Sequence, residues 1–176
     1  MNGMRRRKQN TRAISWGGLS AALIVIMLYM TAVLRYNRLA VLSAASVLIA
    51  LIFIKFGYKA AALVYGASSA LAFLLTPEKT VPLYFLMFFG IYPLVKAAAE
   101  KKRDFIKEYI IKYAFFNLSG IIIYLIAKNV LLGEIDIRIN MLLLIISAEI
   151  LFFIYDRVFS MLITAVKRKT DSAIKF

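Results

Sequence analysis

The chain has 176 residues, of which 62% are apolar, and its formal net charge is +14. A soluble domain carries roughly 45–50% apolar residues, so the composition excludes a disordered chain, a disulfide scaffold and a soluble enzyme. The sequence contains no Cys and no His, which removes thiol nucleophiles, imidazole acid–base catalysis and the usual zinc ligands. We therefore expect a membrane protein without a resident metal or cofactor.

Six apolar segments follow one another along the chain and predict an all-α, polytopic membrane protein with a single transmembrane domain. The first is uncharged over 22 residues. At about 1.5 Å of rise per residue, it crosses a hydrocarbon core of about 30 Å. The shorter segments gain reach because flanking Lys and Arg side chains extend to the head groups. The predicted spans cover residues 13–34, 39–54, 60–75, 80–95, 109–132 and 139–166.

The cationic side chains indicate which way the spans run, because cytoplasmic loops of membrane proteins collect Lys and Arg. If the six spans alternate in direction, sixteen Lys and Arg residues fall on the side of both termini and five on the opposite side. We therefore expect a multi-pass protein of the cell membrane with both termini cytoplasmic and basic tails at residues 1–12 and 167–176. The charges stand in blocks between apolar runs, so no nucleic-acid binding is expected.

Small residues recur every four positions in the first and third predicted spans. This spacing places each set along one helix face, where small side chains let two helix backbones approach closely. Two interpretations stay open: packing between these helices within the chain, or contact with a helix of a separate membrane subunit. The residues are Ala13, Gly17 and Ala21 in the first set and Ala62, Gly66 and Ala70 in the second.

Polar side chains in the last two predicted spans are candidate site residues, because an ionisable group at bilayer depth is a functional candidate by default. Glu149 lies near the predicted midplane, and Asn117 lies at a similar depth, so the two could form a hydrogen bond and bind a substrate. Glu149 could equally serve only to fix helix packing. Nearer the cytoplasmic face, Lys112 and Asp156 are expected to form a structural ion pair. No enzyme motif such as G-x-S-x-G or a Walker A loop occurs, so we expect no catalytic residues.

The six short spans with both ends inside resemble the substrate-binding S components of energy-coupling-factor (ECF) vitamin transporters. Residues 11–23 are similar to the first helix of that family, and residues 56–67 are similar to its turn into the third helix. The resemblance implies a non-catalytic subunit that captures a small molecule and is energised by a separate transmembrane subunit and its ATPases. It also implies that the two sets of small residues contact that transmembrane subunit.

The rod-shape-determining MreD family is similar in size and in number of spans. It gives the competing expectation, an integral scaffold or assembly factor of the cell envelope that transports no ligand. An outward-facing cavity bordered by the last three spans and containing Glu149 would favour the capture subunit, whereas a filled bundle core would favour the scaffold.

Overall fold

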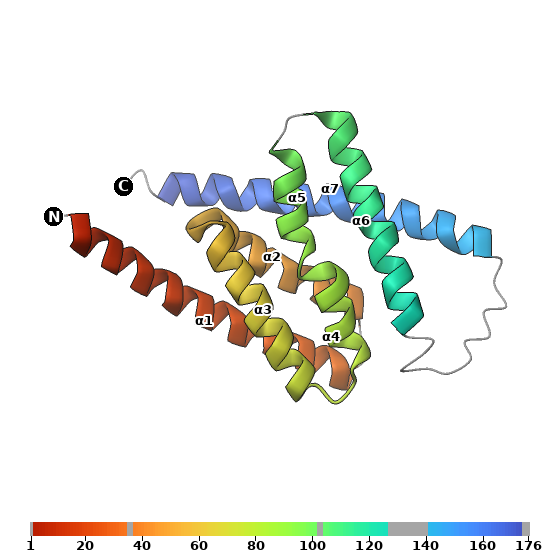
Figure 1. Cartoon of the computed structure of the whole chain (residues 1–176), viewed down its shortest axis with the longest axis horizontal. Helices are drawn as coiled ribbons and strands as arrows, with labels where there is room; N and C mark the ends of the chain where they lie inside the picture. Colours follow the sequence, from red (N-terminus) through yellow and green to blue (C-terminus); the bar gives the residue numbers. More distant parts are fainter. Residues whose placement is uncertain (1, 35–36, 102–103, 127–140, 174–176) are drawn as a thin grey trace.

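The computed structural model describes residues 2–34, 37–101, 104–126 and 141–173, and these residues are helical apart from short turns (Figure 1). Five of the helical segments are long and apolar enough to cross a membrane. The chain is thus all-α, as expected, and has the helices of a multi-pass membrane protein. The five segments are Thr11–Leu34, Arg38–Phe56, Tyr58–Leu75, Thr80–Glu100 and Phe105–Ile126.

The sixth predicted span corresponds to helix α7, Met141–Ala173, which has 33 residues. It is not among the five apolar segments, because its first half and middle carry Glu149, Asp156 and Arg157. Five spans are therefore supported by length and composition, and the sixth stays a prediction. Residues 127–132 of the fifth predicted span and 139–140 of the sixth lie outside the described residues.

The helices extend further than the predicted spans. Helix α1 runs from Asn2 to Leu34, so the part of the predicted tail from residue 2 to residue 12 is helical and continuous with the first span. Helix α7 likewise continues to Ala173, beyond the predicted end at residue 166. A helix can continue beyond the membrane because its backbone hydrogen bonds are made within the helix in either environment. Lys and Arg are compatible with such an extension, since their charged groups can reach water.

Helices α1, α2 (Arg38–Phe56) and α3 (Tyr58–Leu75) pack together into one half of the molecule. The turn between α2 and α3 is a single residue, Gly57, whose φ of 83° lies in the left-handed region that glycine adopts without penalty. Buried side chains from all three helices, such as Ile24, Ile49 and Val64, join the hydrophobic core.

The predicted span at 80–95 is interrupted in the middle. It consists of α4 (Thr80–Tyr84), a π-helical turn η1 (Phe85–Phe89) and α5 (Tyr92–Glu100). Pro93 lies in the first turn of α5, where its missing N–H leaves no bond unmade. This segment is the most buried of the five candidate spans, so the interruption lies at the centre of the fold.

Helix α6 (Phe105–Ile126) is the least buried candidate span. Its start is capped by Asp104, whose carboxylate accepts a hydrogen bond from the Lys107 backbone N–H at 3.5 Å. In Figure 1 α1 runs from the left to the lower right, α2 returns toward the left and α3 runs back to the lower right, whereas α5 ends at the top, α6 descends from there and α7 runs nearly horizontally from right to left. Helices α1, α2 and α3 therefore alternate in direction, and the orientation of the spans in a membrane stays a prediction.

Candidate functional site

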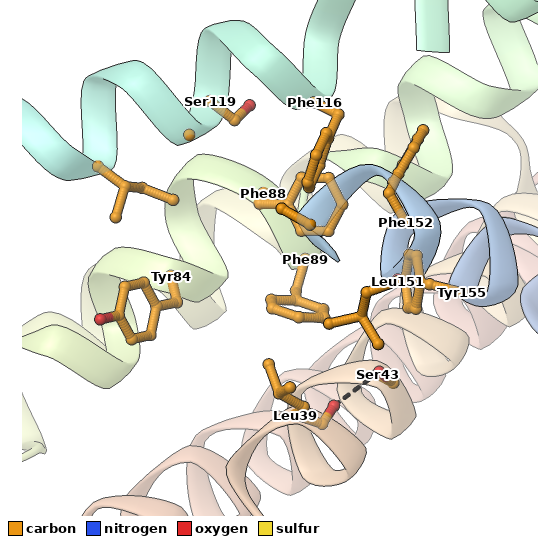
Figure 2. A pocket seen from close by; sticks show the side chains of 13 residues that line it. Leu39, Ser43, Tyr84, Phe88, Phe89, Phe116, Ser119, Leu151, Phe152 and Tyr155 are labelled. Carbon is orange, nitrogen blue, oxygen red and sulfur yellow. Dashed lines mark hydrogen bonds between the residues drawn. The ribbon is translucent and has the colours of Figure 1, made fainter. Parts of the chain in front are cut away.

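An aromatic cavity of about 280 Å³ lies where α2, η1, α6 and α7 meet. Aromatic side chains from η1, α6 and α7 converge on it (Figure 2). Among the described residues that line it, none is charged, and the Ser43 hydroxyl is already used as a donor to the Leu39 carbonyl at 2.6 Å. The lining is Leu39, Ser43, Tyr84, Phe88, Phe89, Phe116, Ser119, Gly120, Ile123, Ala148, Leu151, Phe152 and Tyr155.

The cavity wall is held by contacts between aromatic rings. Phe88 is the central ring and lies 5.6 Å from the ring of Phe116 and 5.7 Å from that of Tyr155, measured between centroids. Phe116 and Phe152 stack at 4.5 Å with an interplanar angle of 12°. Such pairs favour fixed relative orientations. The cavity therefore has a defined, rigid and almost wholly apolar wall.

Side chains from α2 and α3 hold the helix break that carries this wall. The Ser46 hydroxyl donates to the Phe89 carbonyl at 2.5 Å, and the Tyr65 hydroxyl donates to the Leu86 carbonyl at 2.7 Å. Backbone groups released from regular helical bonding inside a membrane need such partners. A Cβ atom at Gly90 would lie 2.7 Å from the Tyr65 ring, so the absence of a side chain there lets Tyr65 reach the break.

Glu149 and Asn117 meet as the sequence predicts. The Asn117 Nδ2 atom donates to Glu149 Oε1 at 2.7 Å and also to the Tyr113 carbonyl at 3.0 Å. The predicted hydrogen bond is confirmed, but neither residue belongs to the cavity lining; their neighbours Phe116 and Ala148 do. The cavity is thus bordered by the last three predicted spans and by α2, and it does not contain Glu149.

The predicted contact between Lys112 and Asp156 is also confirmed, at 3.4 Å, and it is part of a larger ion cluster between α5, α6 and α7. Lys96 pairs with Asp156 and, at 2.9 Å, with Glu100. Lys112 also contacts Glu100 at 3.1 Å. The ion cluster comprises Lys96, Glu100, Glu108, Lys112 and Asp156, with Tyr92 donating its hydroxyl hydrogen bond to Asp156 at 2.5 Å.

The ion cluster is buried at its centre and open at one edge. The side chains of Lys96 and Lys112 are each 3% exposed, whereas that of Glu100 is 45% exposed. A cleft of about 660 Å³ beside it is lined by residues of α2, α3, α5 and α7, including Lys96 and Glu100, and by Lys101 directly after α5. Two buried ammonium groups facing three carboxylates satisfy each other, which is the condition under which buried charge is tolerated.

The two sets of small residues differ in how far the structure buries them. Gly17 and Ala21 are buried, and a Cβ atom at Gly17 would lie 3.2 Å from Val64 Cγ2 of α3. Packing within the chain is therefore the observed role of these two α1 residues. In the second set Gly66 and Ala70 are exposed, and a Cβ atom at Gly66 would meet nothing within 4 Å. Ala13 and Ala62 are half-buried.

Sequence reasoning missed Lys96, Tyr92, Glu100 and Glu108 as members of the ion cluster. The sequence does carry a signal for the cluster, which is the spacing of opposite charges. Two such pairs stand four residues apart, a spacing that places both members on one helix face: Lys96 with Glu100, and Glu108 with Lys112. The cavity residues carry no comparable signal, because aromatic residues in an apolar helix are compatible with any buried or lipid-facing position.

No protein-family model matches the chain, and neither a curated protein nor a solved structure matches it. The geometry of the aromatic cavity, the ion cluster and the polar pair therefore carries the functional argument.

Proposed function

We propose that this protein is a membrane-embedded, non-catalytic capture subunit that binds a small uncharged, apolar molecule in the aromatic cavity. The observation that carries this proposal is the position of the cavity beside the broken helix at residues 85–91. Discontinuous helices at membrane depth recur at the binding sites of transporters, where irregular backbone lines a cavity.

The class of ligand follows from the wall of the cavity. An engineered apolar cavity of about 150 Å³ stays dry and binds benzene, and this cavity, at about 280 Å³, is nearly twice that size. It offers aromatic faces and aliphatic side chains but no charge and few polar groups. A charged or strongly hydrated molecule would lose its water there without gaining partners, so we assign an uncharged compound with one or two rings or an equivalent hydrocarbon group.

Energy for release of the ligand would come from a separate transmembrane subunit and its ATPases, as in the ECF transporters that the sequence resembles. In this arrangement the chain lies in the cell membrane with both termini cytoplasmic. The exposed α3 face at Gly66 and Ala70 is the surface we assign to the transmembrane subunit, because small exposed residues permit close approach of another helix.

The ligand assignment is tested by filling the cavity. Gly120 lines the exposed edge of the cavity, and a Cβ atom at Gly120 would meet nothing within 4 Å, so Gly120→Phe adds a ring at this edge without displacing backbone. Ala114→Phe puts the same ring on an exposed position of the same helix and is the matched control. Each protein is purified in mild detergent, and organic extracts are compared by mass spectrometry.

We expect one apolar compound in near-equimolar amount with the wild-type protein and with Ala114→Phe, and its loss from Gly120→Phe. Equal recovery from all three proteins, or recovery of bulk phospholipid alone, would contradict the proposal. Bulk lipid recovered equally from the two variants also serves as the internal standard for extraction.

A scaffold or assembly factor of the MreD type is the second candidate. The α1–α3 half favours it, since this half is packed around small and aliphatic side chains, contributes only Leu39 and Ser43 of α2 to the cavity lining, and presents the exposed α3 face. A tagged pull-down from native membranes separates the two. Recovery of a polytopic subunit with ATPases, reduced by Gly66→Leu, supports the capture subunit, whereas recovery of envelope-synthesis proteins without ATPases supports the scaffold.

A further inference from the structure

The Glu149 carboxyl group has one oxygen that its surroundings leave without a partner. Oε1 accepts the hydrogen bond from Asn117, whereas Oε2 is buried and forms no hydrogen bond with the described residues. The Asn117 amide cannot supply a second donor, because its two N–H groups already point to the Tyr113 carbonyl and to Oε1. The pair therefore presents only acceptors and needs a donor from outside.

Glu149 lies well inside the apolar part of α7. Counting from Met141, it is about 12 Å along the helix, and Asp156 follows about 10 Å further on. The residues on either side of Glu149 along α7, such as Ile145, Ile146 and Ile150, are exposed and apolar. With α7 as the predicted sixth span, the surroundings of Glu149 are lipid chains, which supply no hydrogen-bond donor, so a free carboxylate oxygen would stay unsatisfied.

Few other titratable groups face Glu149. On α6, Tyr113 interacts electrostatically with Glu149 and more weakly with Asp156. Further along α7, Asp156 is already neutralised by Lys96 and Lys112. Helix α2, which packs against α7, has no charged residue between Arg38 and Lys55, and η1 has none at all. Arg157, two turns further along α7, donates to the Tyr109 hydroxyl at 2.7 Å. Among the described residues, no cation forms an ion pair with Glu149.

We propose that the Glu149–Asn117 pair is a proton-binding site within the membrane. A proton added at Oε2 forms an O–H bond, removes the negative charge and turns the unpaired acceptor into a donor, while Oε1 keeps the hydrogen bond from Asn117. Release breaks the same O–H bond and returns the proton to water. The site is separate from the aromatic cavity, so it stands whether or not the cavity holds a ligand.

Infrared spectroscopy of the purified protein at neutral pH in ether-linked lipid, which has no ester carbonyl to mask the signal, tests this directly. A protonated carboxyl group has a C=O stretching band apart from the amide and carboxylate bands. We expect this band in the wild-type protein and in Asp104→Asn, whose change lies at a carboxylate with a side chain that is 38% exposed. It should be lost in Glu149→Gln, which keeps an oxygen for Asn117 and nearly the same volume. Absence of the band from the wild-type protein would overturn the proposal.

A chemical test locates the proton if Glu149→Gln does not fold. Dicyclohexylcarbodiimide enters lipid and adds to protonated carboxyl groups: the carboxyl oxygen bonds to the central carbon, the proton moves to nitrogen, and an acyl shift gives a stable N-acylurea. Peptide mapping should find the adduct at Glu149 and none at Asp156. An adduct elsewhere, or protection of Glu149 by sodium chloride but not by choline chloride at constant pH, would refute a proton site, the latter in favour of a sodium ion.

Discussion

Replacing Asp156 with Asn removes the charge at the centre of the ion cluster and should destabilise the protein strongly. Lys96 has two carboxylate partners, Asp156 and Glu100, and Lys112 has Asp156 in addition to Glu100 and Glu108. After the substitution, Lys96 keeps only Glu100, although both ammonium groups remain buried.

The magnitude follows from this count of partners. Breaking a buried ion pair by removing one member costs about 3–5 kcal/mol, because the other charge stays buried without compensation. Asn retains an oxygen for the Tyr92 hydroxyl, and Glu100 still contacts both Lys96 and Lys112, so we expect the lower limit, about 3 kcal/mol. At roughly 2–4 °C per kcal/mol for a chain of this length, the apparent Tm falls by about 6–12 °C.

The assay is thermal unfolding in detergent, followed by loss of the folded peak in size-exclusion chromatography. Asp104→Asn is the matched control, since it removes the same charge from an exposed ion pair with Lys107 at 2.9 Å. The hydrogen bond from the Lys107 side chain lowers the pKa of Asp104, so this carboxyl group is also ionised at neutral pH. Screened by solvent, its loss should leave the Tm unchanged.

Two results would refute the reasoning. The first is an equal Tm for Asp156→Asn and Asp104→Asn. The second concerns the double variant Lys96→Met/Asp156→Leu, which removes both charges and fills their space with apolar groups. Because such replacements are often neutral or stabilising, it should be more stable than either single variant, and additive losses would contradict the account.

Two further substitutions test the packing of the α1–α3 half and of the helix break. Gly17→Leu should cost about 1–3 kcal/mol through overlap with Val64, whereas Gly66→Leu, with open space around it, should leave the Tm unchanged; similar effects of both would contradict the assigned packing. Tyr65→Phe leaves the Leu86 carbonyl unpaired and should cost about 1–3 kcal/mol, measured in the same assay, and an unchanged Tm would show that this bond does not hold the break.

The features that sequence anticipated rest on hydropathy and on the regular rise of a helix. Long uncharged runs at residues 13–34 and 39–54 are sufficient to identify spans. The Asn117–Glu149 and Lys112–Asp156 contacts are predicted by matching the depths of residues in two successive spans at about 1.5 Å of rise per residue. Depth matching therefore located these partners without knowledge of the tertiary structure.

The features that sequence did not anticipate depend on distant contacts. The π-helical turn η1 is stabilised by hydroxyl groups from Ser46 and Tyr65, which are far from it in the chain. Pro93 indicates an end or a kink of the helix in this segment, but the residues of η1 itself do not indicate its π-helical geometry. Lys96 follows an apolar run, which by itself indicates only the end of a span. Only the fold brings it to Asp156, 60 residues later.

The polar contacts between α6 and α7 also fix the axial register of these two helices. Lipid chains and apolar side chains attract each other about equally, so apolar surface alone gives neighbouring helices little reason to prefer one sliding position. The three contacts are Asn117–Glu149, Lys112–Asp156 and Tyr109–Arg157. A slip of one helical turn, about 5.4 Å, would part all three at once, so the hairpin has one favoured alignment and resists gradual sliding.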